Sequence, residues 1–101
     1  MKKRNIQASI SNRPGVVRVY HSKIIVTLRK SILDPQGKAV EHGIHSLGYN
    51  AVKNVRIGKF IELNIDAESK EEAESITKQI SGQLLANPVM EDFTVTVEKQ
   101  E

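Results

Sequence analysis

The sequence contains no cysteine and no tryptophan, and these absences narrow the chemistry that the protein can carry out. Without cysteine there can be no disulfide framework, no zinc–thiolate site and no cysteine nucleophile. No apolar run approaches the roughly 18 residues that a membrane-spanning helix needs. The N-terminal sequence also lacks the apolar stretch of a secretory signal, so we expect a cytoplasmic protein. With 101 residues, the chain has the length of one domain.

The formal net charge of +3 is distributed unevenly along the chain. The first 22 residues contain five Lys and Arg and no acidic residue, whereas the remainder is slightly acidic. We expect residues 1–19 to form a flexible basic N-terminal extension and residues 20–101 to form the folded domain. Because the folded part is acidic, its charge argues against nucleic acid as a partner. A contact between the extension and an anionic surface stays open.

Hydrophobic periodicity predicts the order strand, helix, strand, strand, helix, strand. A type II′ turn at Gly58 and Lys59 is expected to join the second and third strands. This order favours an α+β class, a ferredoxin-like βαββαβ sandwich, with a four-stranded antiparallel sheet in the order 4-1-3-2 and two helices on one face. The open face and two free edges of such a sheet predict self-association. The strands centre on residues 24–28, 52–57, 61–65 and 93–97, and the helices cover about 35–47 and 69–86.

Both predicted helices begin at residues that are typical of helix starts. Asp34 can accept a hydrogen bond from an otherwise unpaired backbone N–H, and Pro35 fits the first helical position. Ser69 with Glu72 three residues later has the spacing of a capping box.

Known catalytic motifs are missing from the sequence. There is no G-x-S-x-G and no glycine-rich phosphate loop. His42 and His45 have a spacing that could share a metal, but we interpret them as surface residues of the first helix. We therefore predict no catalytic, cofactor-binding or metal-binding residues. A regulatory or RNA-binding module of the same topology is the alternative, although four aromatic residues give RNA bases little to stack on.

Five blocks of the sequence together resemble the PurS family, the small subunit of phosphoribosylformylglycinamidine (FGAM) synthase. The resemblance covers roughly residues 20–98, and family members usually lack residues 1–19. The blocks are LRKSILDPQG at 28–37, AV at 39–40, LGY at 47–49, VRIGKFIEL at 55–63 and LLANPVMEDF at 84–93.

This resemblance implies a role in purine biosynthesis, within a ligase complex that uses ATP, Mg and glutamine. A synthetase subunit would perform the ATP-dependent chemistry, and a glutaminase subunit would release ammonia. The PurS-like subunit would act as a homodimer or higher oligomer that joins the other two subunits and helps to enclose an ammonia channel. It would bind no cofactor itself, and it would contact neither nucleic acid nor a membrane.

The matching blocks also imply roles for single residues. Structural roles are expected for the loop and helix start and for the glycine of the predicted turn: Asp34, Pro35, Gly37 and Gly58. Candidates for contact with a partner are three polar residues near the predicted hairpin, which would otherwise be only a solvated hairpin: Arg56, Lys59 and Glu62.

Overall fold

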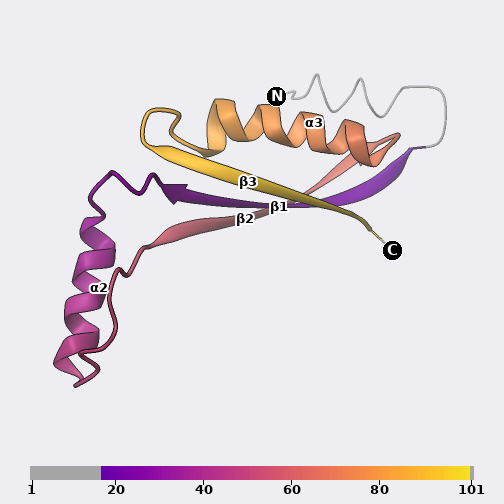
Figure 1. The fold of residues 1–101 in the computed structure, drawn as a ribbon. Helices are drawn as coiled ribbons and strands as arrows, with labels where there is room; N and C mark the ends of the chain where they lie inside the picture. The colour runs from indigo at the N-terminus through magenta and orange to yellow at the C-terminus, as the bar shows by residue number, and fades with distance from the viewer. Residues whose placement is uncertain (1–16, 101) are drawn as a thin grey trace, which may run out of the picture.

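The computed structural model describes residues 17–100, which form three strands, two α-helices and one short π-helix. Figure 1 shows a twisted sheet with one helix lying along it and a second helix projecting away from its end. The elements in chain order are β1 (Arg18–Leu28), α2 (Pro35–Ser46), β2 (Gly58–Ala67), α3 (Lys70–Ile80), η1 (Ser81–Leu85) and β3 (Glu91–Lys99).

The sheet has the strand order β2-β1-β3, and both strand pairs are antiparallel. Ile24 of the central strand β1 lies opposite Ile61 of β2 and Val95 of β3. Side chains alternate between the two faces along each strand, so Ile24 is fully buried while its neighbour Ile25 is half exposed. The α+β class is therefore confirmed, and three of the four predicted strands occupy the predicted relative positions.

Helix α3 covers the inner face of the sheet and encloses the hydrophobic core (Figure 1). Its start is confirmed: Ser69 Oγ accepts a hydrogen bond from Glu72 N–H at 3.1 Å. The Glu72 carboxylate returns to the backbone N–H of Glu68 at 2.8 Å, one residue earlier than in an ideal capping box. The core consists of two apolar clusters, one built around Tyr20 and Ala73 and the other around Ile24 and Ala86.

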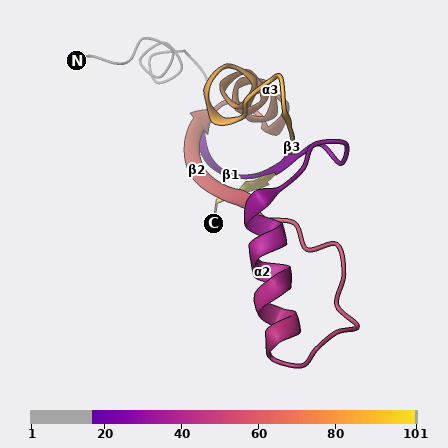
Figure 2. The same ribbon diagram turned by 90° about the vertical axis from the view of Figure 1, so that its left-hand side faces the viewer.

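The predicted strand at 52–57 does not exist, and α2 does not lie on the sheet with α3. Figure 2 shows α2 directed away from the sheet, with the segment that follows it running back beside it. This segment makes hydrogen bonds to side chains of α2: Val55 N–H donates to Glu41 Oε1 at 3.2 Å, and the Val52 carbonyl accepts from His45 Nε2 at 2.7 Å. These hydrogen bonds take the place of the strand pairing that was predicted for this segment. The positive φ of Asn54, 59°, also departs from the extended backbone of a strand. The four-stranded sandwich with both helices on one face is therefore a wrong prediction.

The turn predicted at Gly58 and Lys59 is also wrong, because both residues belong to β2 and Gly58 lies opposite Thr27. A glycine is nevertheless required there for a different reason. A Cβ at position 58 would lie 2.7 Å from the Val26 carbonyl oxygen, which is closer than real Cβ atoms approach.

Strand β1 begins at Arg18, so Arg18 and Val19 belong to the sheet and pair with Ala67 and Asp66. The rest of the predicted basic extension, residues 1–16, lies outside the described residues, and its flexibility stays a prediction. Neither α-helix within residues 17–100 has the length and apolar character that crossing a membrane requires.

Candidate functional site

Residues 29–57 form a projection that we call the arm, which leaves the sheet after β1 and returns at β2 (Figure 2). The remaining described residues, 17–28 and 58–100, are called the body. Several apolar side chains on the arm are exposed: Leu47 is 75% exposed, Tyr49 64% and Val40 43%. Exposed apolar side chains gathered on one projecting element are typical of a surface that contacts another protein.

The arm and the body carry opposite charge. The arm contains five Lys and Arg against two acidic residues, whereas the body contains six Lys and Arg against nine acidic residues. Opposite charge on two parts of one molecule favours contact between the arm of one copy and the body of another.

Asp34 joins the two chain segments at the root of the arm. One carboxylate oxygen, Oδ1, accepts from Gly37 N–H at 3.0 Å and caps α2, as predicted. The other, Oδ2, accepts from Ile57 N–H at 2.7 Å, on the returning segment. The bond from Ile57, followed by the one from Gly37, lowers the pKa of Asp34 from its ordinary value. Asp34 is thus more than a helix cap, because it also closes the base of the arm.

Pro35 and Gly37 lie at the start of α2, where the helix approaches the returning segment. Pro35 is the first residue of α2, and Gly37 is buried against the returning segment. A Cβ at position 37 would collide with the carbonyl oxygen of Val55. Glycine therefore allows the helix start to approach the returning backbone closely.

The three predicted contact residues do not form one patch. Arg56 lies at the arm root, where its Nη2 donates to the carbonyls of Arg29 and Ile32, both at 2.9 Å. Lys59 lies toward the inner side of the sheet, with its Nζ 3.8 Å from Glu91 Oε1. Glu62 lies on the open face, where its Oε2 is 3.3 Å from Nε2 of His21. Whether any of them contacts a partner stays a prediction.

His21 is held on the open face by two residues of β2. Its Nδ1 lies 2.8 Å from Asn64 Oδ1, and its Nε2 faces the Glu62 carboxylate. The Asn64 bond first, and then the Glu62 bond, raise the pKa of His21 above its ordinary value. Glu62 therefore has an internal partner, just as Arg56 does.

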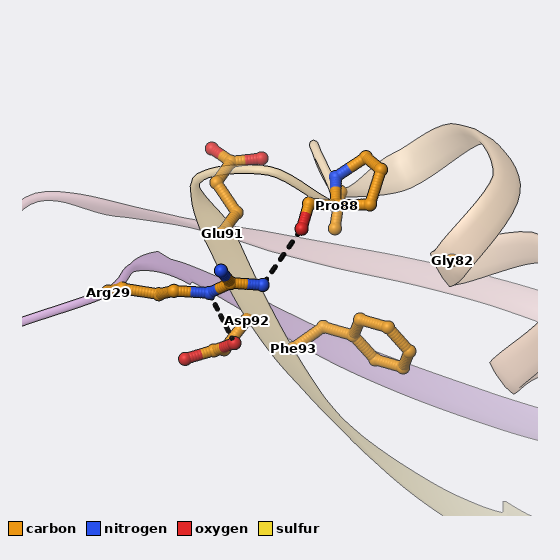
Figure 3. A pocket seen from close by; sticks show the side chains of 7 residues that line it. Arg29, Gly82, Pro88, Glu91, Asp92 and Phe93 are labelled. Atoms are coloured by element: carbon orange, nitrogen blue, oxygen red, sulfur yellow. Dashed lines mark hydrogen bonds and ion pairs between the residues drawn. The ribbon is translucent and has the colours of Figure 1, made fainter. Parts of the chain in front are cut away.

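No motif or spacing in the sequence indicates a role for Arg29, which borders a pocket of about 430 Å³ beside η1. Its guanidinium donates to the carbonyls of Pro88 and Val89 at 2.8 and 3.0 Å, and its Nε donates to Asp92 Oδ1 at 3.1 Å. Figure 3 shows this side chain across the pocket mouth, with bonds to Pro88 and Asp92. All three guanidinium nitrogens thus bind the chain itself, so the pocket presents no uncommitted arginine to a ligand.

No group of three or more potential metal ligands occurs within the described part of the chain. His42 and His45 lie on α2, and the Nε2 of His45 donates to the Val52 carbonyl at 2.7 Å. This hydrogen bond holds the imidazole ring of His45 against the returning segment of the arm.

A protein-family comparison matches residues 21–99 to PurS, described as phosphoribosylformylglycinamidine (FGAM) synthase. The chain belongs to the PurS family. It is therefore a subunit of FGAM synthase, a ligase complex of purine biosynthesis.

Relatives and solved structures agree with the PurS assignment. The chain is 46% identical over 81 residues to the PurS subunit of Bacillus subtilis, which covers 80% of this chain and 95% of that protein. It is 47% identical to the Synechocystis subunit over 80% of this chain and 81% of that protein. The Thermotoga maritima PurS structure superposes with a TM-score of 0.76 at 33% identity, covering 84% of this chain and 98% of that one. A chain in the structure of PurLQS from Thermotoga maritima is 35% identical, with a TM-score of 0.73 and coverage of 79% and 98%.

Proposed function

We propose that this PurS chain is the bridging subunit of its complex, joining the synthetase subunit to the glutaminase subunit and supporting ammonia transfer between them. The observation that carries the proposal is the arm. Its apolar side chains Leu47 and Tyr49 are 75% and 64% exposed, and a chain similar to this one is part of the structure named PurLQS from Thermotoga maritima. ATP and Mg belong to the synthetase in this proposal, and the chain itself holds no cofactor.

A bridging subunit would prevent the loss of ammonia during glutamine-dependent amination. Ammonia that escapes into water at neutral pH is protonated, and ammonium has no lone pair with which to attack. A subunit that holds two active sites in register and excludes water between them avoids this loss. Such a subunit needs surfaces and rigidity, and it needs no nucleophile or phosphate loop of its own.

Self-association is the second part of the proposal. The arm is basic and apolar while the body is acidic, so the arm of one copy suits the body of another in a homodimer or higher oligomer. In a two-fold dimer the contact would be made twice, because each copy supplies one arm and one body.

Reconstitution tests the bridging function. The chain is combined with the glutaminase and synthetase subunits, and FGAM formation is measured with glutamine and, separately, with ammonium salts. We expect glutamine-dependent turnover to require this chain and ammonia-dependent turnover by the synthetase to need it much less. Equal dependence of both activities on the chain would contradict a bridge and indicate a direct effect on the synthetase site.

A further inference from the structure

The direction of the arm is fixed at its root and not along its length. Helix α2 makes no extensive contact with any strand of residues 17–100 or with α3, and Figure 2 shows it standing clear of the sheet. Its neighbour is the returning segment of the same arm. The bonds at the root must therefore determine where the arm points relative to the body.

Two arginines connect three separate segments at this root. Arg56, on the returning segment, donates to the carbonyls of Arg29 and Ile32 on the outgoing segment, both at 2.9 Å. Arg29 in turn donates to the carbonyls of Pro88 and Val89 in the loop before β3, and to the carboxylate of Asp92 at the start of β3. The backbone N–H of Arg29 also donates to the Met90 carbonyl at 2.9 Å. The returning segment is thus tied to the body through the outgoing one.

We propose that Arg29 and Arg56 are positioning residues, which set the direction of the arm relative to the sheet and thereby the geometry in which this subunit assembles. The inference rests on the proposed bridging function for its biological meaning, but the geometry it asserts lies within one chain. It also reassigns Arg56: the guanidinium holds the arm in place, and it is not kept available for a partner.

The chemistry of arginine suits this role. A guanidinium is planar, always charged and equipped with five N–H donors in fixed directions, so it can bind several carbonyl oxygens at once. The carbonyls of residues 29, 32, 88 and 89 lie in loops outside the helices and strands, and that of Arg29 also accepts the Ile32 N–H at 2.9 Å. Two arginines thus replace the packing that an irregular junction lacks.

The absence of native cysteine makes the direct test simple. Spin labels are attached to His42→Cys on α2 and Thr96→Cys on β3, in the full chain, and diluted with excess unlabelled chain so that distances within one molecule dominate. Arg56→Gln and Arg29→Gln are compared with Lys53→Gln, which removes the same charge from an exposed position on the same arm. Amide exchange at Ile57 is measured in parallel.

We expect both arginine variants to broaden the distribution of distances between the labels, and Lys53→Gln to leave it unchanged. Loss of one net hydrogen bond at the root should also accelerate exchange of the Ile57 amide by about twofold to tenfold. Equal distributions for Arg56→Gln and Lys53→Gln would overturn the proposal. If Arg29→Gln disturbs β3, the Arg56→Gln comparison still decides the outcome. Neither readout requires the other subunits, so failure here is distinct from failure of the bridging function.

Discussion

Ser22 and Thr77 share a hydrogen bond of 2.8 Å between their hydroxyl oxygens, and neither residue has any exposed surface. Ser22 lies on the inward face of β1 between Tyr20 and Ile24, and Thr77 lies on the facing side of α3. The pair therefore separates the two apolar clusters of the core. A polar bond of this kind fixes how α3 is seated on the sheet, because only one alignment satisfies both hydroxyls.

Removing both hydroxyls of the pair should cost less than the sum of removing each one alone. Thr77→Val leaves Ser22 without this bond in a dry interior, which should lower the free energy of unfolding by about 1–3 kcal/mol. The double variant Ser22→Ala with Thr77→Val should lose less than the sum of the two single changes. Urea unfolding of the four proteins gives the coupling, and strict additivity would show that the bond contributes nothing specific.

Two glycines of the same helix should respond in opposite ways to alanine. Gly43 has open space where a Cβ would lie, so Gly43→Ala should stabilise α2 by about 0.5–1 kcal/mol through helix propensity. Gly37→Ala places its Cβ against the Val55 carbonyl and should destabilise the arm root. Amide exchange in α2 and in residues 55–57 reports both effects. Protection that rises in both variants would mean that the close approach at Gly37 is not required.

The arm root should loosen in acid at an unusually low pH. The pKa of Asp34 lies below its ordinary value of 3.8, because the charged form accepts the Ile57 and Gly37 amides. The stability that this carboxylate contributes is therefore present above pH 3.8 and is lost as the pH falls through its lowered pKa.

The amide proton resonances of Ile57 and Gly37 should titrate together with a midpoint below 3.8. They should not titrate in Asp34→Asn, which keeps the shape of the side chain without its charge. A shared midpoint at or above 3.8 would contradict the two-bond arrangement.

Self-association should depend on the tip of the arm. Leu47 is 75% exposed, so Leu47→Asp should change the free energy of unfolding of one chain by no more than about 0.5 kcal/mol. If the tip is buried between copies, the same change should lower the mass measured by light scattering toward that of the monomer. Ser46→Asp is the matched control, since it adds the charge at the neighbouring position and keeps the leucine. Unaltered mass for Leu47→Asp at micromolar concentration would contradict an interface at the tip.

Local patterns in the sequence were enough to predict β1, α3, β3 and the start of α2. The signals that predicted these elements act over a few residues, so the rest of the fold does not override them. They are the strict alternation in 61–65 and 93–97 and the capping residues Asp34 and Ser69. The segment 52–57 has the spacing of a strand, but its backbone is bound by side chains of α2 that lie about 10 residues earlier. The composition of segment 52–57 does not indicate these hydrogen-bond partners.

The candidate site was less predictable for a similar reason. Arg29 and Arg56 bind backbone carbonyls, and a carbonyl is present at every residue, so no pairing of residue types marks the contact. Lys59 and Glu62 appeared to belong to one hairpin, whereas alternation along β2 places them on opposite faces. The sequence indicates that Asp34 caps a helix. It does not indicate the second hydrogen bond, which Asp34 accepts from Ile57, because that bond depends on where the returning segment lies.

Strands β1 and β2 are antiparallel neighbours, and such neighbours need only a two-residue turn between them. The arm inserted at this point makes the closing loop about 30 residues long, which costs about 2 kcal/mol more in chain entropy than a tight turn would. Helix α2 adds no extensive packing to the sheet in return. This entropy cost lowers the stability of a single chain, and we expect contact between the arm and another protein to offset it.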